Sequence, residues 1–142
     1  MKDYNGLFKH CVNVREKDGR YMPVRFSEER LRLYAEEKPE CPYSLCPIGI
    51  SMEFITSAGE ISFEYNATRV IYPVKAFDFY ENGVFVDFVR PPDEETRGKI
   101  IYRKKTPGDV VIECFFPVGV DLEFFNFDFG DHKTRGDHYG VG

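Results

Sequence analysis

The sequence has no tryptophan, and its 142 residues include only five serines and three histidines. None of the serines stands in the Gly-x-Ser-x-Gly or Gly-Asp-Ser frame that usually holds the nucleophile of a serine hydrolase. The longest apolar runs, such as Phe115-Phe116-Pro117-Val118, are far shorter than a membrane-spanning helix. The first residues lack the apolar core of a secretory signal. We therefore expect a cytoplasmic protein that has no membrane partner and needs no cofactor.

Charge and cysteine content narrow the choice further. The net charge of −5 and the pI of about 5.3 argue against a nucleic-acid binder, which needs a basic face. The four cysteines, Cys11, Cys41, Cys46 and Cys114, do not form the two close pairs of a zinc site. We expect free thiols and no metal, with a Cys41–Cys46 disulfide only in an oxidising compartment.

What is abundant is strand patterning, with one helix near the start. Ser27 is a suitable N-cap, Glu28 and Glu29 favour the first turn, and the pattern predicts a helix that ends before Pro39. Residues 6–12 and 21–26 are expected to be extended, and Pro23 restricts the second segment to a sheet edge or a strand end. The proline-punctuated stretch 39–47 is expected to be a loop.

Alternating segments after residue 50 predict three antiparallel strand pairs. Their turns are Ser57-Ala58-Gly59-Glu60, Glu81-Asn82-Gly83 and Thr106-Pro107-Gly108-Asp109, and Asn-Gly is a strong hairpin signal. The last strand, residues 120–129, has an extra apolar residue at Phe125 that suggests a bulge. The pattern predicts an all-β fold: an antiparallel β-sandwich of jelly-roll type over residues 1–130. Residues 131–142 are expected to form a flexible polar tail or linker.

Aromatic residues supply candidate contact positions. Alternation turns Phe85, and one of Phe124 and Phe125, away from the core, so Phe85 and Phe125 are candidate docking residues. The same alternation turns five phenylalanines inward: Phe54, Phe63, Phe77, Phe79 and Phe88. Candidate ligand-binding residues, for example toward a carbohydrate, are Tyr43, Tyr72, Tyr80, Tyr102 and Asp121.

No residue is assigned a catalytic role. Asp121 and Glu123 share a strand face, but calcium needs six or more oxygens, so a polar outer face is the simpler reading. His10 alternates with apolar residues and is expected to be a hydrogen-bonded core histidine. His132 and His138 fall in the predicted tail, which lacks the rigid support that a catalytic site needs.

Four segments, in this order, carry a resemblance to a known family. They are Arg25-Phe26-Ser27-Glu28, the stretch 46–65, Phe77-Asp78-Phe79-Tyr80-Glu81-Asn82-Gly83, and Phe116-Pro117-Val118-Gly119-Val120-Asp121-Leu122-Glu123. Together they resemble the N-terminal β-sandwich of two-domain SGNH/GDSL-type esterases, including acetylxylan-esterase-like enzymes. The similarity covers roughly residues 5 to 130.

The resemblance implies that the β-sandwich and the catalytic residues lie in separate domains. In that family the catalytic domain follows the sandwich and opens with a strand that ends in Gly-Asp-Ser. Here Gly136-Asp137 is followed by His138, so the nucleophile is not carried over. We expect a non-catalytic accessory domain whose partner is an SGNH catalytic domain, in the same chain or a separate one. The alternative is a stand-alone carbohydrate-binding or protein-interaction module.

Overall fold

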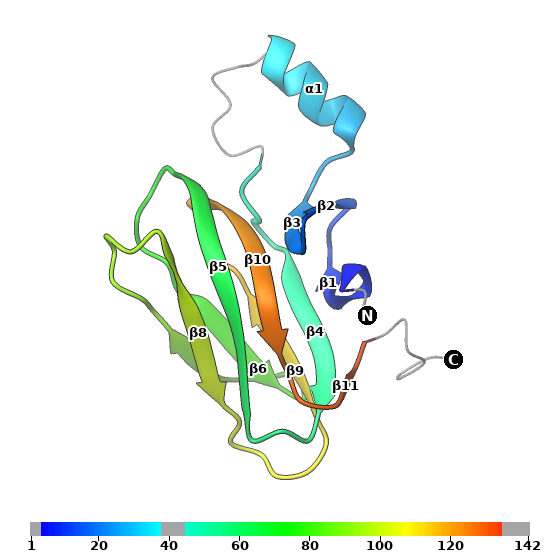
Figure 1. The fold of residues 1–142 in the computed structure, drawn as a ribbon, viewed down its shortest axis with the longest axis vertical. Helices are drawn as coiled ribbons and strands as arrows, with labels where there is room; N and C mark the ends of the chain where they lie inside the picture. The colour runs from blue at the N-terminus through cyan, green and yellow to red at the C-terminus, as the bar shows by residue number, and fades with distance from the viewer. Residues whose placement is uncertain (1–3, 38–44, 135–142) are drawn as a thin grey trace.

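The computed structural model describes residues 4–37 and 45–134, and these form two antiparallel β-sheets packed face to face (Figure 1). One sheet runs in the order β1 (Phe8–Lys9), β4 (Ser51–Thr56), β9 (Val110–Phe115), β6 (Phe77–Glu81) and β7 (Val84–Val89), with β11 (His132–Lys133) also paired to β4. The other runs in the order β2 (Asn13–Lys17), β3 (Arg20–Val24), β10 (Val120–Asp128), β5 (Glu60–Val70) and β8 (Arg97–Arg103). The predicted all-β sandwich is confirmed.

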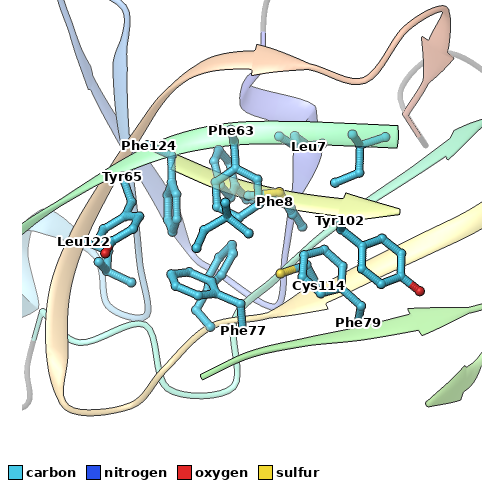
Figure 2. Close-up of a cluster of buried hydrophobic side chains, with 14 of the residues drawn as sticks. Leu7, Phe8, Phe63, Tyr65, Phe77, Phe79, Tyr102, Cys114, Leu122 and Phe124 are labelled. Carbon is cyan, nitrogen blue, oxygen red and sulfur yellow. The ribbon is translucent and has the colours of Figure 1, made fainter. Parts of the chain in front are cut away.

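Aromatic side chains from both sheets fill the space between the layers. Phe77 of β6 packs against Phe63 of β5, with ring centres 5.7 Å apart, and Phe79 of β6 stacks on Tyr102 of β8 (Figure 2). Full burial of one such side chain contributes about 1.5–3 kcal/mol. This packing confirms the inward positions predicted for Phe54, Phe63, Phe77 and Phe79, all of which are buried.

Two of the three predicted hairpins are wrong. β4 and β5 are joined by the turn after Thr56, yet β4 pairs with β1, β9 and β11 while β5 pairs with β10 and β8. Likewise β8 and β9 belong to different sheets. Alternation and a turn signal are the same for a hairpin and for a crossing between two sheets, because both arrangements bury one face of each strand against the same core.

The hairpin at Asn82-Gly83 is confirmed. β6 pairs with β7, and Asn82 and Gly83 have φ values of 51° and 84°. Two consecutive positive φ angles are characteristic of the tight turn whose twist matches that of the flanking strands.

The N-terminal part is more irregular than its pattern suggests. Instead of one strand over residues 6–12, a 3₁₀ turn, η1 (Asn5–Leu7), leads into the two-residue β1. His10 has a φ of 65° and an exposed side chain, so the prediction of a core histidine is wrong. The chain then forms the β2–β3 hairpin around Asp18-Gly19. Pro23 lies one residue from the end of β3, as expected.

The predicted helix is present as α1 (Glu28–Glu37), which Figure 1 shows beyond one end of the sandwich. The Ser27 hydroxyl accepts a hydrogen bond from the backbone N–H of Arg30 at 3.2 Å, as an N-cap does. Arg15 of β2 donates two hydrogen bonds of 2.8 Å to Glu28 and ties the first turn of the helix to the five-stranded sheet.

The last strands extend the fold past the predicted boundary. β10 shows the predicted irregularity, a register shift between Phe125 and Asp128 with Asn126 at a φ of 51°. The chain does not leave the sandwich at residue 131, because β11 pairs with Thr56 and Ile55 of β4. The His132 ring stacks on Tyr4, so the tail assignment is wrong for this histidine, while His138 lies outside the described residues.

Two buried charged side chains fasten loops to the sandwich. The Lys75 ammonium donates hydrogen bonds to the carbonyls of Pro73, Pro92 and Asp93 at 3.0–3.2 Å, which uses its three protons. Glu81 of β6 accepts hydrogen bonds from the Tyr102 hydroxyl and from the backbone N–H groups of Lys105 and Thr106. Each network satisfies a buried charge that would otherwise be costly to desolvate.

Candidate functional site

The outer face of the six-stranded sheet carries a compact grid of aromatic and acidic side chains. Cross-strand pairing places Asp78 of β6 between Phe115 of β9 and Phe88 of β7, and places Tyr80 between Glu113 and Phe85. Residues directly opposite each other in antiparallel strands share a face, with Cβ atoms about 5 Å apart. These six residues are called the aromatic–carboxylate face below: Asp78, Tyr80, Phe85, Phe88, Glu113 and Phe115.

A bulge in β7 sets which side chains reach this face. Phe79 pairs with Asp87 but Tyr80 pairs with Phe85, so Val86 is an extra residue in the strand. The shift places Phe85 and Phe88, three residues apart, on the same side of the sheet. The prediction that Phe88 points inward is therefore wrong, because strict alternation does not allow for the extra residue.

β7 is the terminal strand of its sheet and leaves its apolar side chains uncovered. Phe85 is 50% and Phe88 53% exposed, and Val84 on the same strand is 65% exposed. An exposed edge strand with bulky apolar side chains and few charges invites association. Phe85 thus has the exposure expected of a docking residue, and its docking role stays a prediction.

On this face the Tyr80 ring is perpendicular to the rings of Phe85 and Phe115. Tyr80 stands edge-on to Phe85 at 5.6 Å with an interplanar angle of 75°, and edge-on to Phe115 at 5.6 Å with an angle of 73°. Tyr80, Phe85 and Phe115 therefore do not form one flat platform.

The two carboxylates of the face are held differently. Glu113 accepts a 2.7 Å hydrogen bond from the Ser51 hydroxyl and lies 3.8 Å from Nε2 of His10. Among residues 4–37 and 45–134, no donor or cation lies within bonding distance of the Asp78 carboxylate. Burial raises the pKa of Asp78 above its ordinary value, since the flanking phenyl rings disfavour the charged form.

The outward phenylalanine of the five-stranded sheet is covered, whereas those of β7 are exposed. Phe125 of β10 is only 6% exposed because two guanidinium groups cover it, Arg20 at 4.6 Å and Arg97 at 5.0 Å from the ring centre. Arg20 also donates a 2.7 Å hydrogen bond to Glu123. Phe125 therefore lacks the free surface that its predicted docking role requires.

The predicted ligand-binding residues do not converge. Tyr80 lies on the aromatic–carboxylate face and Tyr72 is exposed in the loop after β5, whereas Tyr102 is buried against Phe79. Asp121 is buried and accepts a hydrogen bond from the Cys46 thiol at 3.2 Å. Tyr43 lies outside the described residues.

The Cys46–Asp121 contact is a closed, buried pair. Burial, followed by the Asp121 carboxylate, raises the pKa of Cys46 to about 12, which keeps the thiol protonated at neutral pH. Burial also raises the pKa of Asp121, against the opposing effects of the thiol hydrogen bond and Arg69. Asp121 is thus committed to Cys46 rather than to calcium, and the described residues contain no group of three side chains suited to a metal ion.

The cluster of Ser51, Glu113 and His10 contains triad residue types in an order unsuited to catalysis. The carboxylate of Glu113 lies between the serine and the histidine, so Ser51 donates its proton to Glu113 and not to the His10 imidazole. Ser51 is also fully buried, which denies a substrate access to its hydroxyl. The arrangement ties β4 to β9.

Sequence patterning missed most of this face. Asp78, Glu113 and Phe115 looked like ordinary alternating strand residues, since nothing local indicates that β9 and β6 are neighbours. The Asn-Gly hairpin did indicate that Tyr80 and the Phe85 region lie together.

Comparison with known proteins places the fold beside part of a larger enzyme. No protein-family profile matches the sequence, and no curated protein does. A solved structure of the salicylyl-acyltransferase SsfX3 from a tetracycline biosynthetic pathway is similar, with a TM-score of 0.73 and 16% identity over 89% of this chain. This chain spans 37% of that protein's length, so it shares its fold with a minor part of that enzyme.

A second solved structure is more distant. It is a family two carbohydrate esterase from Clostridium thermocellum in complex with cellohexaose, with a TM-score of 0.41 and 16% identity over 60% of this chain and 25% of that one.

Among residues 4–37 and 45–134, no helix is long and apolar enough to cross a membrane.

Proposed function

We propose that this chain is a non-catalytic accessory domain of an SGNH/GDSL-type hydrolase or acyltransferase. In this role the sandwich packs against a catalytic domain and helps to shape its substrate cleft. The observation that carries the proposal is the uncovered apolar surface on the outer face of β7, formed by Phe85 and Phe88. The fold likeness to 37% of an acyltransferase supports it, because in that enzyme the similar part is joined to further chain.

The test compares this chain with the protein as it occurs in its source cells. An antibody raised against the sandwich should detect a protein of roughly 40 kDa, the size of two domains. Hydroxyl-radical labelling should then modify Phe85 and Phe88 less in the cellular protein than in this chain. Tyr72, which is 58% exposed and lies outside the aromatic–carboxylate face, is the internal control.

Two results would overturn the proposal. One is a cellular protein of 16.6 kDa whose Phe85 and Phe88 are labelled as strongly as in the isolated chain. The other is hydrolysis of p-nitrophenyl acetate by the isolated chain at an enzymatic rate, because the proposed domain contains no catalytic residue.

Carbohydrate binding by a stand-alone module is the second candidate. The observation in its favour is that Tyr80, one of the predicted ligand residues, lies beside two carboxylates on a sheet face. Calorimetric titration with xylo-oligosaccharides tests it. Heat of binding at millimolar ligand that disappears in Tyr80→Ala would favour this candidate, and no heat would eliminate it.

A further inference from the structure

Asp78 occupies an unusual position for a surface carboxylate. Its cross-strand neighbours on either side are both phenylalanines, Phe115 and Phe88. Arg90, which follows β7, lies 3.3 Å from Asp93, and Lys9 of β1 lies 3.7 Å from Glu53. His10, which stacks on Phe115, lies 3.8 Å from Glu113. Asp78 is therefore a carboxylate between two phenylalanines, and no cation of the described residues is paired with it.

The other sheet of the same protein shows what completes such an arrangement. There a phenylalanine and a carboxylate, Phe125 and Glu123, are both engaged by Arg20. One guanidinium contacts the ring through its face and the carboxylate through a charge-assisted hydrogen bond. Over residues 4–37 and 45–134, the aromatic–carboxylate face has the rings and the acid but no guanidinium paired with Asp78.

Ring orientation distinguishes between classes of ligand. Sugar rings stack on flat aromatic platforms, whereas perpendicular rings around a negative charge resemble the walls of a cation-binding pocket. With interplanar angles of 75° and 73° between Tyr80 and its ring neighbours Phe85 and Phe115, this face does not offer a single flat platform. Glu113 adds a further negative charge at its margin.

We propose that the aromatic–carboxylate face binds an arginine side chain of the polypeptide that covers it, with the guanidinium seated between Phe88 and Phe115 over Asp78. The identity of that polypeptide as the adjoining catalytic domain rests on the proposed function. The binding chemistry itself rests only on the residues of this chain.

The experiment is an NMR titration of this chain with N-acetyl-arginine amide. N-acetyl-citrulline amide, which has the same shape without the charge, is the matched probe. We expect resonances of Asp78, Phe88 and Phe115 to shift with arginine, and Asp78→Asn to weaken binding about tenfold, or ~1.4 kcal/mol. Asp109→Asn, an exposed carboxylate in the loop before β9, should leave the affinity unchanged.

The outcomes separate the two proposals. Equal shifts with citrulline, an unchanged affinity in Asp78→Asn, or shifts at these residues only with xylohexaose would overturn the arginine site. If arginine binds while Phe85 and Phe88 are labelled equally in the cellular protein and this chain, the site stands and the covering domain is refuted. Protection of both phenylalanines without arginine binding would refute the site alone.

Discussion

The two sheets of this sandwich use the same residue types on their outer faces to opposite effect. On the five-stranded sheet, Phe125 is covered by Arg20 and Arg97, and Glu123 receives hydrogen bonds from Arg20 and Asn66. On the six-stranded sheet, Phe85 and Phe88 are about half exposed, and within the described part of the chain no cation pairs with Asp78. The outward side chains of the five-stranded sheet are covered by other residues of the chain. Those of the six-stranded sheet are left exposed, as on one side of a protein–protein interface.

The largest expected effect contrasts the outward phenylalanines themselves. Phe125→Ala should destabilise the protein by about 3 kcal/mol, because it removes a ring buried between β10 and two arginines. Phe85→Ala, the matched change on the other face, should cost less than about 1 kcal/mol, since half of that side chain is already in water. Urea denaturation measures both. Equal losses would show that the two faces do not differ in the way described.

The second contrast lies within one strand, between inward Glu81 and outward Asp78. Glu81→Gln should cost about 2 kcal/mol, because the amide cannot accept hydrogen bonds at both of its ends from Tyr102, Lys105 and Thr106. Thermal denaturation at pH 7 measures the loss. If Glu81→Gln leaves the thermal stability unchanged, this network does not hold the loop between β8 and β9.

Acid titration of stability should show the role of Glu81 directly. Burial raises the pKa of Glu81, but the hydrogen bonds from Tyr102, Lys105 and Thr106 outweigh it and lower the net pKa. The ionised group therefore adds stability above its unfolded-state pKa, and that stability is lost as the pH falls through the lower folded-state value. Glu81→Gln should remove this part of the acid dependence.

The sequence was informative where neighbours along the chain are also neighbours in space. Ser27 capping α1 and Asn82-Gly83 turning β6 into β7 both depend on contacts within a few residues. The inward positions of Phe63 and Phe77 followed from alternation, which needs no knowledge of the partner strand.

Prediction failed where a residue's exposure and neighbours depend on strands that are distant in the sequence. Phe85 and Phe125 have the same outward orientation, but only the pairing of β10 with β3 and β5 brings Arg20 close to Phe125. Phe88 was misplaced because the extra residue Val86 has no local signal. Asp78 became a candidate only once β9, more than 30 residues away, was known to lie beside β6.

The third contrast tests the arginine cover. Arg20→Met keeps an apolar stem over Phe125 but removes the guanidinium from the ring and from Glu123, so we expect a loss of about 1 kcal/mol. High salt should reduce the difference in unfolding free energy between Arg20→Met and the unsubstituted protein, because salt screens the ion pair between Arg20 and Glu123. Arg103→Met, which breaks the exposed pair with Glu60, is the control and should be nearly neutral. A comparable loss in both variants would deny Arg20 a special role.

The smallest effect, and the only one of opposite sign, belongs to Asp78. Burial raises its pKa, so the folded state binds a proton more readily than the unfolded state. Ionised Asp78 thus subtracts stability above its ordinary pKa, and stability returns as the pH falls through the raised value. Asp78→Asn should make the isolated chain slightly more stable at pH 7, by less than about 1 kcal/mol, with little change near pH 3. A destabilised variant would mean that Asp78 has a stabilising partner in this chain.

The crossing of β4 and β5 between the sheets has a consequence for how the protein is made. Neither strand pairs with the next strand along the chain. Ser51 can therefore pair with Phe115, and Val70 with Val120, only after those later residues have been synthesised. Folds dominated by such distant pairings typically fold in milliseconds to seconds. On the ribosome, which adds about 5–20 residues per second, the early strands therefore emerge seconds before their partners. During that interval Phe54 of β4 has only the two-residue β1 as a strand partner, and Phe63 of β5 has none until β8 emerges. We expect chaperone contacts on the nascent chain to peak there and end once β10 has emerged.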